Sequence, residues 1–214
     1  MNLDRYDDVK DRLVIQLANR GNVAPDEYHV PIEGTDMAVT FGIEIGEDRN
    51  GPVQVSVTEE RFAKFGVTGE TLYRDALNIA VEDQPVVMCP LVNPEDMCGE
   101  RMGLYVAFAF GFLDNGAVCL LFPRFMSDAA LRTGQGFYIL TSSRNELMLI
   151  PAADGSKAGW LREMIRGING NMVRKGDGLS DFMYYCESGR LYLVHEDGTK
   201  EAVTMPFEEL AAVS

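Results

Sequence analysis

An apolar stretch in the middle of the chain decides the fold: 103-GLYVAFAFGFLDNGAVCLLFP-123, continued by 137-FYILTSSRNELMLIP-151. Its first part predicts a hairpin that pairs Leu104–Phe112 with Ala117–Phe122 through the turn residues Asp114, Asn115 and Gly116. Both strands are apolar on both faces, which is typical of strands that are covered on both faces. We therefore expect this hairpin to be the innermost part of the core.

Further strand pairs are predicted on both sides of this stretch. Met37–Ile45 and Pro52–Val57 alternate apolar and polar residues around Asn50-Gly51, so each strand is expected to turn one face to the core and the other to water. The remaining expected strands are 84–92, 137–141, 146–150, 182–186, 190–194 and 201–205. Because the strand at 84–92 contains Pro90 and proline cannot donate to a ladder, we expect it at the edge of a sheet.

Helical periodicity predicts helices between these strands. Val9, Leu13 and Leu17 recur at every fourth position and predict a first helix over 6–20 with Asp4 as its N-cap. Further helices are expected after Thr58, at 69–82 after Thr68, at 123–133, at 156–170 and at 208–212. In the helix at 156–170, an apolar stripe is expected to face the core, made of Trp160, Leu161, Met164, Ile165 and Ile168.

These elements predict an α+β fold, in which antiparallel β hairpins form a mixed or antiparallel sheet with helices packed on it. A length of 214 residues fits a single domain over 1–214. A division into two subdomains, 1–92 and 103–214, with a loop at 93–103, is left open.

Composition narrows the classes of partner. The net charge of −14 opposes direct nucleic-acid binding and binding to anionic membranes, because both need a cationic surface. No apolar run reaches the ~18 residues of a membrane helix. The N-terminus is charged and has no apolar core of a signal peptide, so the expected location is the cytoplasm. The remaining partner classes are another protein or a second copy of the chain.

Residues that bind metals or carry out acid–base chemistry are few. The two histidines, His29 and His195, have no second ligand or base at a diagnostic spacing, so no metal site and no cofactor are expected. The four cysteines make no disulfide framework; a bridge between Cys89 and Cys98 is possible in geometry, but reduced thiols are expected in a cytosolic chain.

Two sets of residues are the candidates for a site. Ser142 and Ser143 lie in a turn between two apolar strands, where an exposed hydroxyl can act, but the flanking residues are not those of a nucleophile elbow and a structural turn is favoured. Arg124, Arg132 and Arg144 bracket the central stretch. They would bind an anion if the fold brings them together, and are otherwise solvated charges.

Several segments resemble a known family: 9-VKDRLVIQLANR-20, 61-RFAKFGVTGETLYRDAL-77, 137-FYILTSSRNELMLIP-151, 161-LREMIRGING-170 and 179-LSDFMYY-185. The chain is similar to DUF5688, a family of unknown function of anaerobic gut Firmicutes. The resemblance implies that the chain corresponds to the C-terminal part of longer members. It implies no site residue, because these motifs have no known chemistry. Members often carry Ser-Ile-His-Glu where this chain has Ser143-Arg144-Asn145-Glu146, so an acid–base role for that histidine is not available here.

Three hypotheses for the function follow. We favour a non-enzymatic, cytosolic module that binds a protein or a small ligand, because no acid–base set converges in the sequence and both histidines are poorly placed. The first alternative is a hydrolase or transferase that uses Ser142 and Ser143 near the turn at 142–145. The second alternative is an acidic mimic, which would inhibit a nucleic-acid-binding protein through the acids of the N-terminal half.

Overall fold

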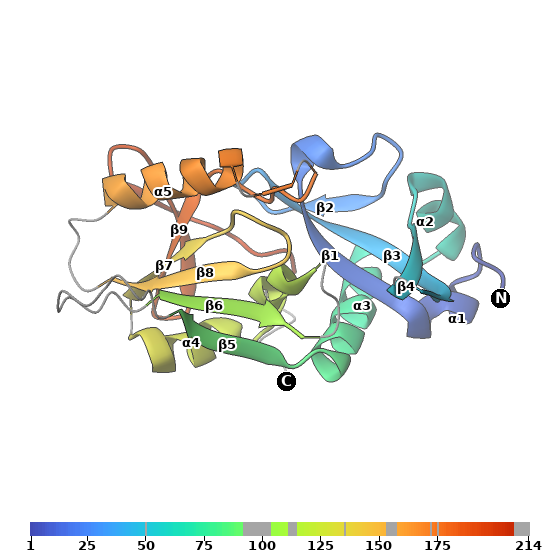
Figure 1. Ribbon diagram of the computed structural model, residues 1–214. Coiled ribbons are helices and arrows are strands. Elements are labelled where there is room, and N and C mark those ends of the chain that lie inside the picture. Colours follow the sequence, from blue (N-terminus) through green and yellow to red (C-terminus); the bar gives the residue numbers. More distant parts are fainter. Residues whose placement is uncertain are drawn as a thin grey trace.

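The computed structural model describes residues 1–49, 51–91, 104–110, 115–134, 136–152, 158–171, 173–174 and 176–207. Two antiparallel sheets with helices confirm the α+β class (Figure 1). The expected loop at 93–103, the residues Asn50, Asp114 and Cys98, and the expected helix at 208–212 lie outside the described residues. The division into subdomains therefore stays a prediction.

The larger sheet has seven strands in the order β11-β10-β9-β7-β8-β6-β5, and every neighbouring pair is antiparallel. The strands are β5 (Val86–Leu91), β6 (Leu104–Ala109), β7 (Gly136–Leu140), β8 (Leu147–Pro151), β9 (Met183–Glu187), β10 (Arg190–Val194) and β11 (Lys200–Ala202). The predicted pairs at 137–150 and 182–194 are confirmed. The predicted edge position of β5 is confirmed as well.

Strand β7 lies at the centre of this sheet and is buried on both faces. Phe137 and Ile139 point into the larger core cluster, whereas Tyr138 and Leu140 point into a second cluster. Helix α5 (Ala158–Asn171) covers the second cluster with Leu161 and Ile165. Trp160, which was expected in the same stripe, is 49% exposed instead, because it lies one position before the buried pair at Leu161 and Ile165 and so points away from the sheet.

The smaller sheet has four strands, β1 (Leu13–Asn19), β2 (His29–Pro31), β3 (Met37–Asp48) and β4 (Gly51–Ser56). Strand β3 pairs with β1 along one side and with β2 and β4 along the other. The predicted hairpin of β3 with β4 is confirmed. The prediction that one face of β3 is exposed to water is wrong, because the first seven residues of β3 are all buried.

The predicted helix at 6–20 is wrong. A single turn of helix, α1 (Tyr6–Val9), and the short 3-10 segment η1 (Lys10–Arg12) lead directly into strand β1. The residues Leu13, Ile15 and Leu17 alternate with a period of two, and each is at most 2% exposed in the core. The apolar pattern fits both a helical period and a period of two, and pairing with β3 selects the strand. In α1, Arg5 takes the N-cap position expected for Asp4.

The predicted hairpin at 104–122 is also corrected. Leu104–Ala109 forms β6, but the residues Gly116–Leu121 form a 3-10 helix, η3, because β6 already has β5 and β8 as its neighbours. All six residues of η3 are buried, and η3 packs against β6 and β1, between the two sheets. The apolar character of this segment therefore reflects burial between sheets, and the innermost strand is β7.

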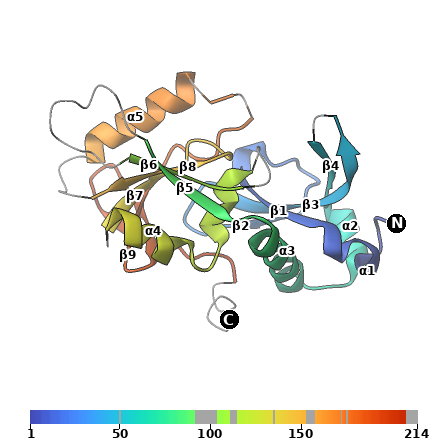
Figure 2. The same ribbon diagram turned by 60° about the horizontal axis from the view of Figure 1, so that its bottom comes forward.

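The two helices after the first hairpin are confirmed with their caps. In α2 (Glu59–Phe65), the Thr58 hydroxyl accepts a hydrogen bond from Arg61 N, and Gly66 ends the helix at a φ of 66°. In α3 (Gly69–Asp83), Thr68 caps in the same way, and α3 packs on β1. Helix α4 spans Phe125–Thr133 and lies beneath the larger sheet, on the side opposite α5 (Figures 1 and 2).

Candidate functional site

A cavity of about 810 Å³ lies between the end of α3, strand β5 and helix α4. Volumes of about 300–1,000 Å³ are typical of ligand pockets. Its walls come from segments that lie apart in the sequence, namely Val81–Met88 and Phe122–Arg132. In both ribbon views, β5 and α4 run in similar directions at this end of the sheet (Figures 1 and 2).

The outer edge of β5 borders this cavity. Phe110 N donates a hydrogen bond to Pro85 O, so Val86 and Ala109 form a pair without direct hydrogen bonds between them. By alternation, the N–H and C=O groups of Val86 and Met88 point outward, away from β6. No hydrogen bond from another strand of the described chain reaches these groups. The edge is therefore open to pairing with an added strand.

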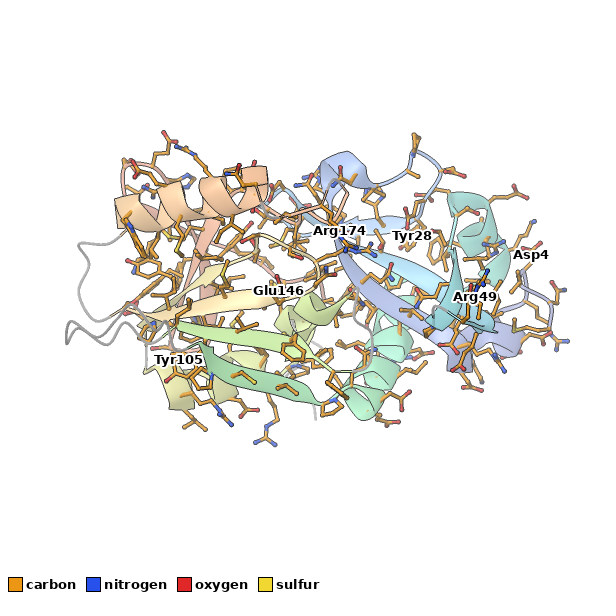
Figure 3. The ribbon with its side chains drawn as sticks, viewed as in Figure 1. Asp4, Tyr28, Arg49, Tyr105, Glu146 and Arg174 are labelled. Atoms are coloured by element: carbon orange, nitrogen blue, oxygen red, sulfur yellow. The ribbon has the colours of Figure 1, made fainter. Side chains whose placement is uncertain are left out.

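Pro90 belongs to the same outward set. It lies opposite Tyr105 of β6, whose side chain is seen at the α4 end of the sheet in Figure 3. Because an N–H at this position would point away from β6, the proline removes no hydrogen bond from the ladder. The open edge consequently offers two N–H donors, from Val86 and Met88, and ends at a position without a donor.

Apolar side chains surround the cavity without being buried. Val81 is 44% exposed, Val86 39% and Leu131 86%, and all three line the cavity. Phe110, which is hydrogen-bonded to Pro85 at the same end of β5, is 61% exposed. Contiguous exposed apolar groups next to polar ones are typical of sites where another molecule binds.

Helix α4 adds a charged stripe to the cavity wall. Arg124, Asp128 and Arg132 are spaced by four residues each, so they follow one face of the helix, and all three line the cavity. All three are exposed, and none forms an ion pair within the described part of the chain. Gly134, at a φ of 91°, follows the last helical residue.

Gln84 is a buried polar residue on the opposite wall. It is 5% exposed, and its Oε1 accepts no hydrogen bond from the described residues. An unsatisfied buried carbonyl costs about 1–3 kcal/mol. Gln84 also lines a second cavity, of about 430 Å³, against β1. The sequence had no signal for this residue.

Two of the three arginines considered from the sequence come together and the third does not. Arg124 and Arg132 share the cavity described above. Arg144 lies elsewhere and pairs with Asp177, with 3.7 Å between Arg144 Nε and Asp177 Oδ1. The helical spacing of Arg124 and Arg132 was visible in the sequence, but the strand they face was not.

Ser142 and Ser143 are both buried, at 3% and 6% exposure. Asn145 N donates a hydrogen bond to Ser143 Oγ at 3.0 Å, so this hydroxyl stabilises the local turn. Ser142 Oγ has no hydrogen-bond partner among the described residues. No histidine is hydrogen-bonded to either hydroxyl: His29 Nδ1 contacts Glu27 O, and His195 Nε2 contacts Glu201 Oε2. Among the described residues, neither hydroxyl is hydrogen-bonded to a base, and both serines are buried.

A polar cluster that the sequence did not indicate joins the two sheets. Asp36 Oδ1 accepts a hydrogen bond from Ser180 Oγ at 2.6 Å, and Asp36 Oδ2 accepts one from Asn19 Nδ2 at 3.1 Å. Burial raises the pKa of the Asp36 carboxyl above its ordinary value, although Ser180 lowers it in part. Arg174 lies at this junction in Figure 3. Asp36 and Ser180 are 144 residues apart along the chain, so no local sequence pattern predicts their contact.

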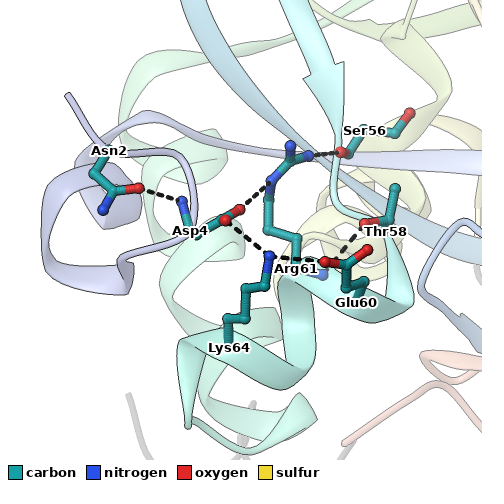
Figure 4. A network of polar contacts seen from close by, with 7 residues as sticks. All are labelled: Asn2, Asp4, Ser56, Thr58, Glu60, Arg61 and Lys64. Carbon is teal, nitrogen blue, oxygen red and sulfur yellow. Dashed lines mark hydrogen bonds and ion pairs between the residues drawn. The ribbon is translucent and has the colours of Figure 1, made fainter.

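A second polar network holds the N-terminus on α2 (Figure 4). Lys64 Nζ lies 2.9 Å from Asp4 Oδ2 and 2.8 Å from Glu60 Oε1, and Arg61 Nη1 donates to Ser56 O. The hydrogen bond from Lys64 lowers the pKa of Asp4, and that to Glu60 raises the pKa of Lys64. The contacts of Lys64 with Asp4 and Glu60 are largely exposed, so we assign this network the role of fixing the chain end.

Within the described residues, no three His, Cys, Asp or Glu side chains gather as metal ligands would. In the same part of the chain, no helix combines the length and the apolar character that crossing a bilayer requires.

A family model matches residues 1–188 and describes a family of unknown function, DUF5688. No curated protein and no solved structure matches the chain.

Proposed function

The chain belongs to DUF5688, a family of unknown function, and from that premise we propose that it is a non-catalytic module that binds an extended segment of another protein in the groove between β5 and α4. The observation that carries the proposal is the open edge of β5 beside a cavity of about 810 Å³. An extended peptide adds to such an edge through its main chain, and the cavity beside the strand accepts its side chains.

The chemistry of the groove supports binding in preference to catalysis. Among the described residues, its lining combines apolar side chains with two arginines, one aspartate and one glutamine, and includes no histidine, cysteine or serine. Main-chain hydrogen bonds give affinity for any extended segment, while the side chains beside the strand give selectivity. The cytoplasmic location expected from the sequence is compatible with this role and is part of the proposal.

The test is a phage-displayed library of random twelve-residue peptides, selected on the full chain. We expect the library to yield enriched peptides that bind the purified protein in solution. Met88→Pro removes an outward donor from β5 and should weaken their binding about tenfold, equivalent to about 1.4 kcal/mol. Thermal unfolding of the variant establishes that it is folded.

The matched control is Ala202→Pro on β11, the other edge of the same sheet. His195 N donates to Thr199 O, and Val203 N to Leu191 O, so the N–H of Ala202 also points outward. This control should leave binding unchanged. Leu131→Glu, at an 86% exposed site on the groove wall, supplies a second variant that keeps the fold and should also weaken binding. Absence of any enriched peptide, or binding that both groove variants leave intact, would overturn the proposal.

A further inference from the structure

The charged stripe of α4 has the spacing of alternate residues in an extended chain. Arg124, Asp128 and Arg132 are each four residues apart, which is a rise of about 6.0 Å along a helix. Two residues of a β-strand rise about 6.6 Å. In a strand added to β5, every second side chain would therefore be spaced almost as the three charges of the stripe are spaced along α4.

We propose that the groove selects segments with an acidic, a basic and an acidic residue at positions i, i+2 and i+4, where the two acids meet Arg124 and Arg132 and the base meets Asp128. This inference rests on the proposed function and names its partner class. Residues i, i+2 and i+4 of a strand lie on one face, so a single face of the bound segment meets the helix. The residues between them face the other side.

The charges of the stripe are available for such a partner. Some basic residues elsewhere on the surface are paired: Lys64 contacts Asp4 and Glu60, and Arg166 contacts Glu196. The three charges of the stripe form no ion pair with any described residue, although Asp128 lies one turn from each arginine. The lining carries a net positive charge in a chain whose net charge is −14, so it attracts acidic segments locally.

The occupant is a different protein and not a second copy. Throughout the 214 residues, no lysine or arginine has an acidic residue two positions before it and another two positions after it. The required triplet is thus absent from this chain.

Two labelled peptides test the inference by fluorescence anisotropy. The first is Thr-Val-Glu-Val-Lys-Val-Glu-Val-Thr and the second exchanges its charges, Thr-Val-Lys-Val-Glu-Val-Lys-Val-Thr. We expect the wild-type chain to bind the first at least tenfold more tightly, and the preference to shrink as salt is raised, because exposed charges are screened. A triple variant, Arg124→Glu, Asp128→Arg and Arg132→Glu, should reverse the preference. Arg20→Gln, at an exposed position outside the groove, is the control and should keep it.

The outcomes separate the two proposals. Equal affinity for both peptides, or a preference that the triple variant does not reverse, overturns the charge pattern and leaves the strand-binding function standing. Binding of neither peptide, together with no enrichment from the random library, overturns both. Enrichment from the library of peptides that lack the acidic–basic–acidic triplet overturns the pattern alone. A preference that Arg20→Gln also abolishes would show that overall charge, and not the stripe, selects the peptide.

Discussion

The two edges of the seven-stranded sheet are built differently. Strand β11 has three residues, Lys200–Ala202, all exposed and two of them charged. Strand β5 has six, and its residues are apolar. Short, charged edge strands resist pairing with other chains, whereas longer apolar edges invite it. Among the described strands, the sheet is therefore protected at β11 and open at β5, and the open edge is the one with a cavity beside it.

The support behind each edge differs as well. Next to β5, strand β6 packs on the buried η3, whereas Lys200 of β11 lies over the ring of Tyr185, with 3.3 Å between Nζ and the ring centroid. The strand beside the open edge is therefore held by buried packing, and the protected edge by a surface contact. This difference orders the expected effects of substitution at the two edges.

The largest effect is expected at Gly116, which starts η3. A Cβ there would overlap the main-chain carbonyl oxygen of Asn145 and lie 2.7 Å from Phe108 Cβ, so the main chain would have to shift. Gly116→Ala should lower the free energy of unfolding by about 3 kcal/mol. Gly167→Ala in α5 is the control, since no atom lies within 4 Å of its added Cβ. It should stabilise by about 1 kcal/mol. Urea unfolding measures both, and equal effects would contradict the packing of η3.

The next effect compares adjacent positions of β5. The N–H of Val87 points into the ladder, opposite Phe108, so Val87→Pro removes a hydrogen bond and leaves a carbonyl without a donor. We expect a loss of about 2–3 kcal/mol. Met88→Pro should cost less than Val87→Pro, because its N–H points outward and the substitution removes only the packing of a half-buried side chain. Chemical denaturation measures the free energy of unfolding of both variants. A larger loss at Met88 would show that the register of β5 is shifted by one residue.

The cluster between the sheets predicts a dependence on pH. Burial raises the pKa of Asp36 in the folded chain, so the folded state holds this proton to higher pH than the unfolded state does. Stability should therefore be highest below the unfolded-state pKa and fall as pH rises through the folded-state pKa. Asp36→Asn should remove this pH-dependent contribution to stability. In a plot of the urea unfolding midpoint against pH, the variant should therefore have a smaller slope than the wild type. The control Asp26→Asn, at an exposed position that makes no contact with this cluster, should keep the wild-type slope.

The smallest effect is expected at β11. Lys200→Ala removes the contact with the Tyr185 ring and should cost about 0.5–1 kcal/mol, the usual contribution of an exposed cation–π pair. Lys200→Arg keeps a cation over the ring and should cost less. Thermal unfolding at low and high salt measures both. A loss of several kcal/mol would mean that β11 supports the sheet as strongly as β5 does.

Much of the fold could be predicted where the signal is local. The caps at Thr58 and Thr68, the glycine that ends α2, the hairpins of β7 with β8 and β9 with β10, and the edge position of β5 all follow from neighbouring residues. The helix expected at 6–20 failed because Leu13 and Leu17 fit both a period of four and a period of two. Only pairing with β3 selects between them.

The site was predictable in part for the same reason. The spacing of Arg124, Asp128 and Arg132 along α4 is a local property, and it was present in the sequence. The wall they face comes from β5 and Gln84, about 40 residues earlier, across a contact that no local pattern encodes. Ser142 and Ser143 illustrate the converse, because a turn with hydroxyl groups reads as exposed until the surrounding chain buries it.

The sequence by itself determined the α+β class, the caps and turns, and the proline that marks β5 as an edge, since each depends on the conformations open to a few adjacent residues. Only the tertiary structure decided that 13–19 is a strand, that 116–121 packs as a 3-10 helix between two sheets, and that α4 faces the open edge of β5. These outcomes depend on contacts between distant segments, and the free energy of burying them together outweighs the local preference of each.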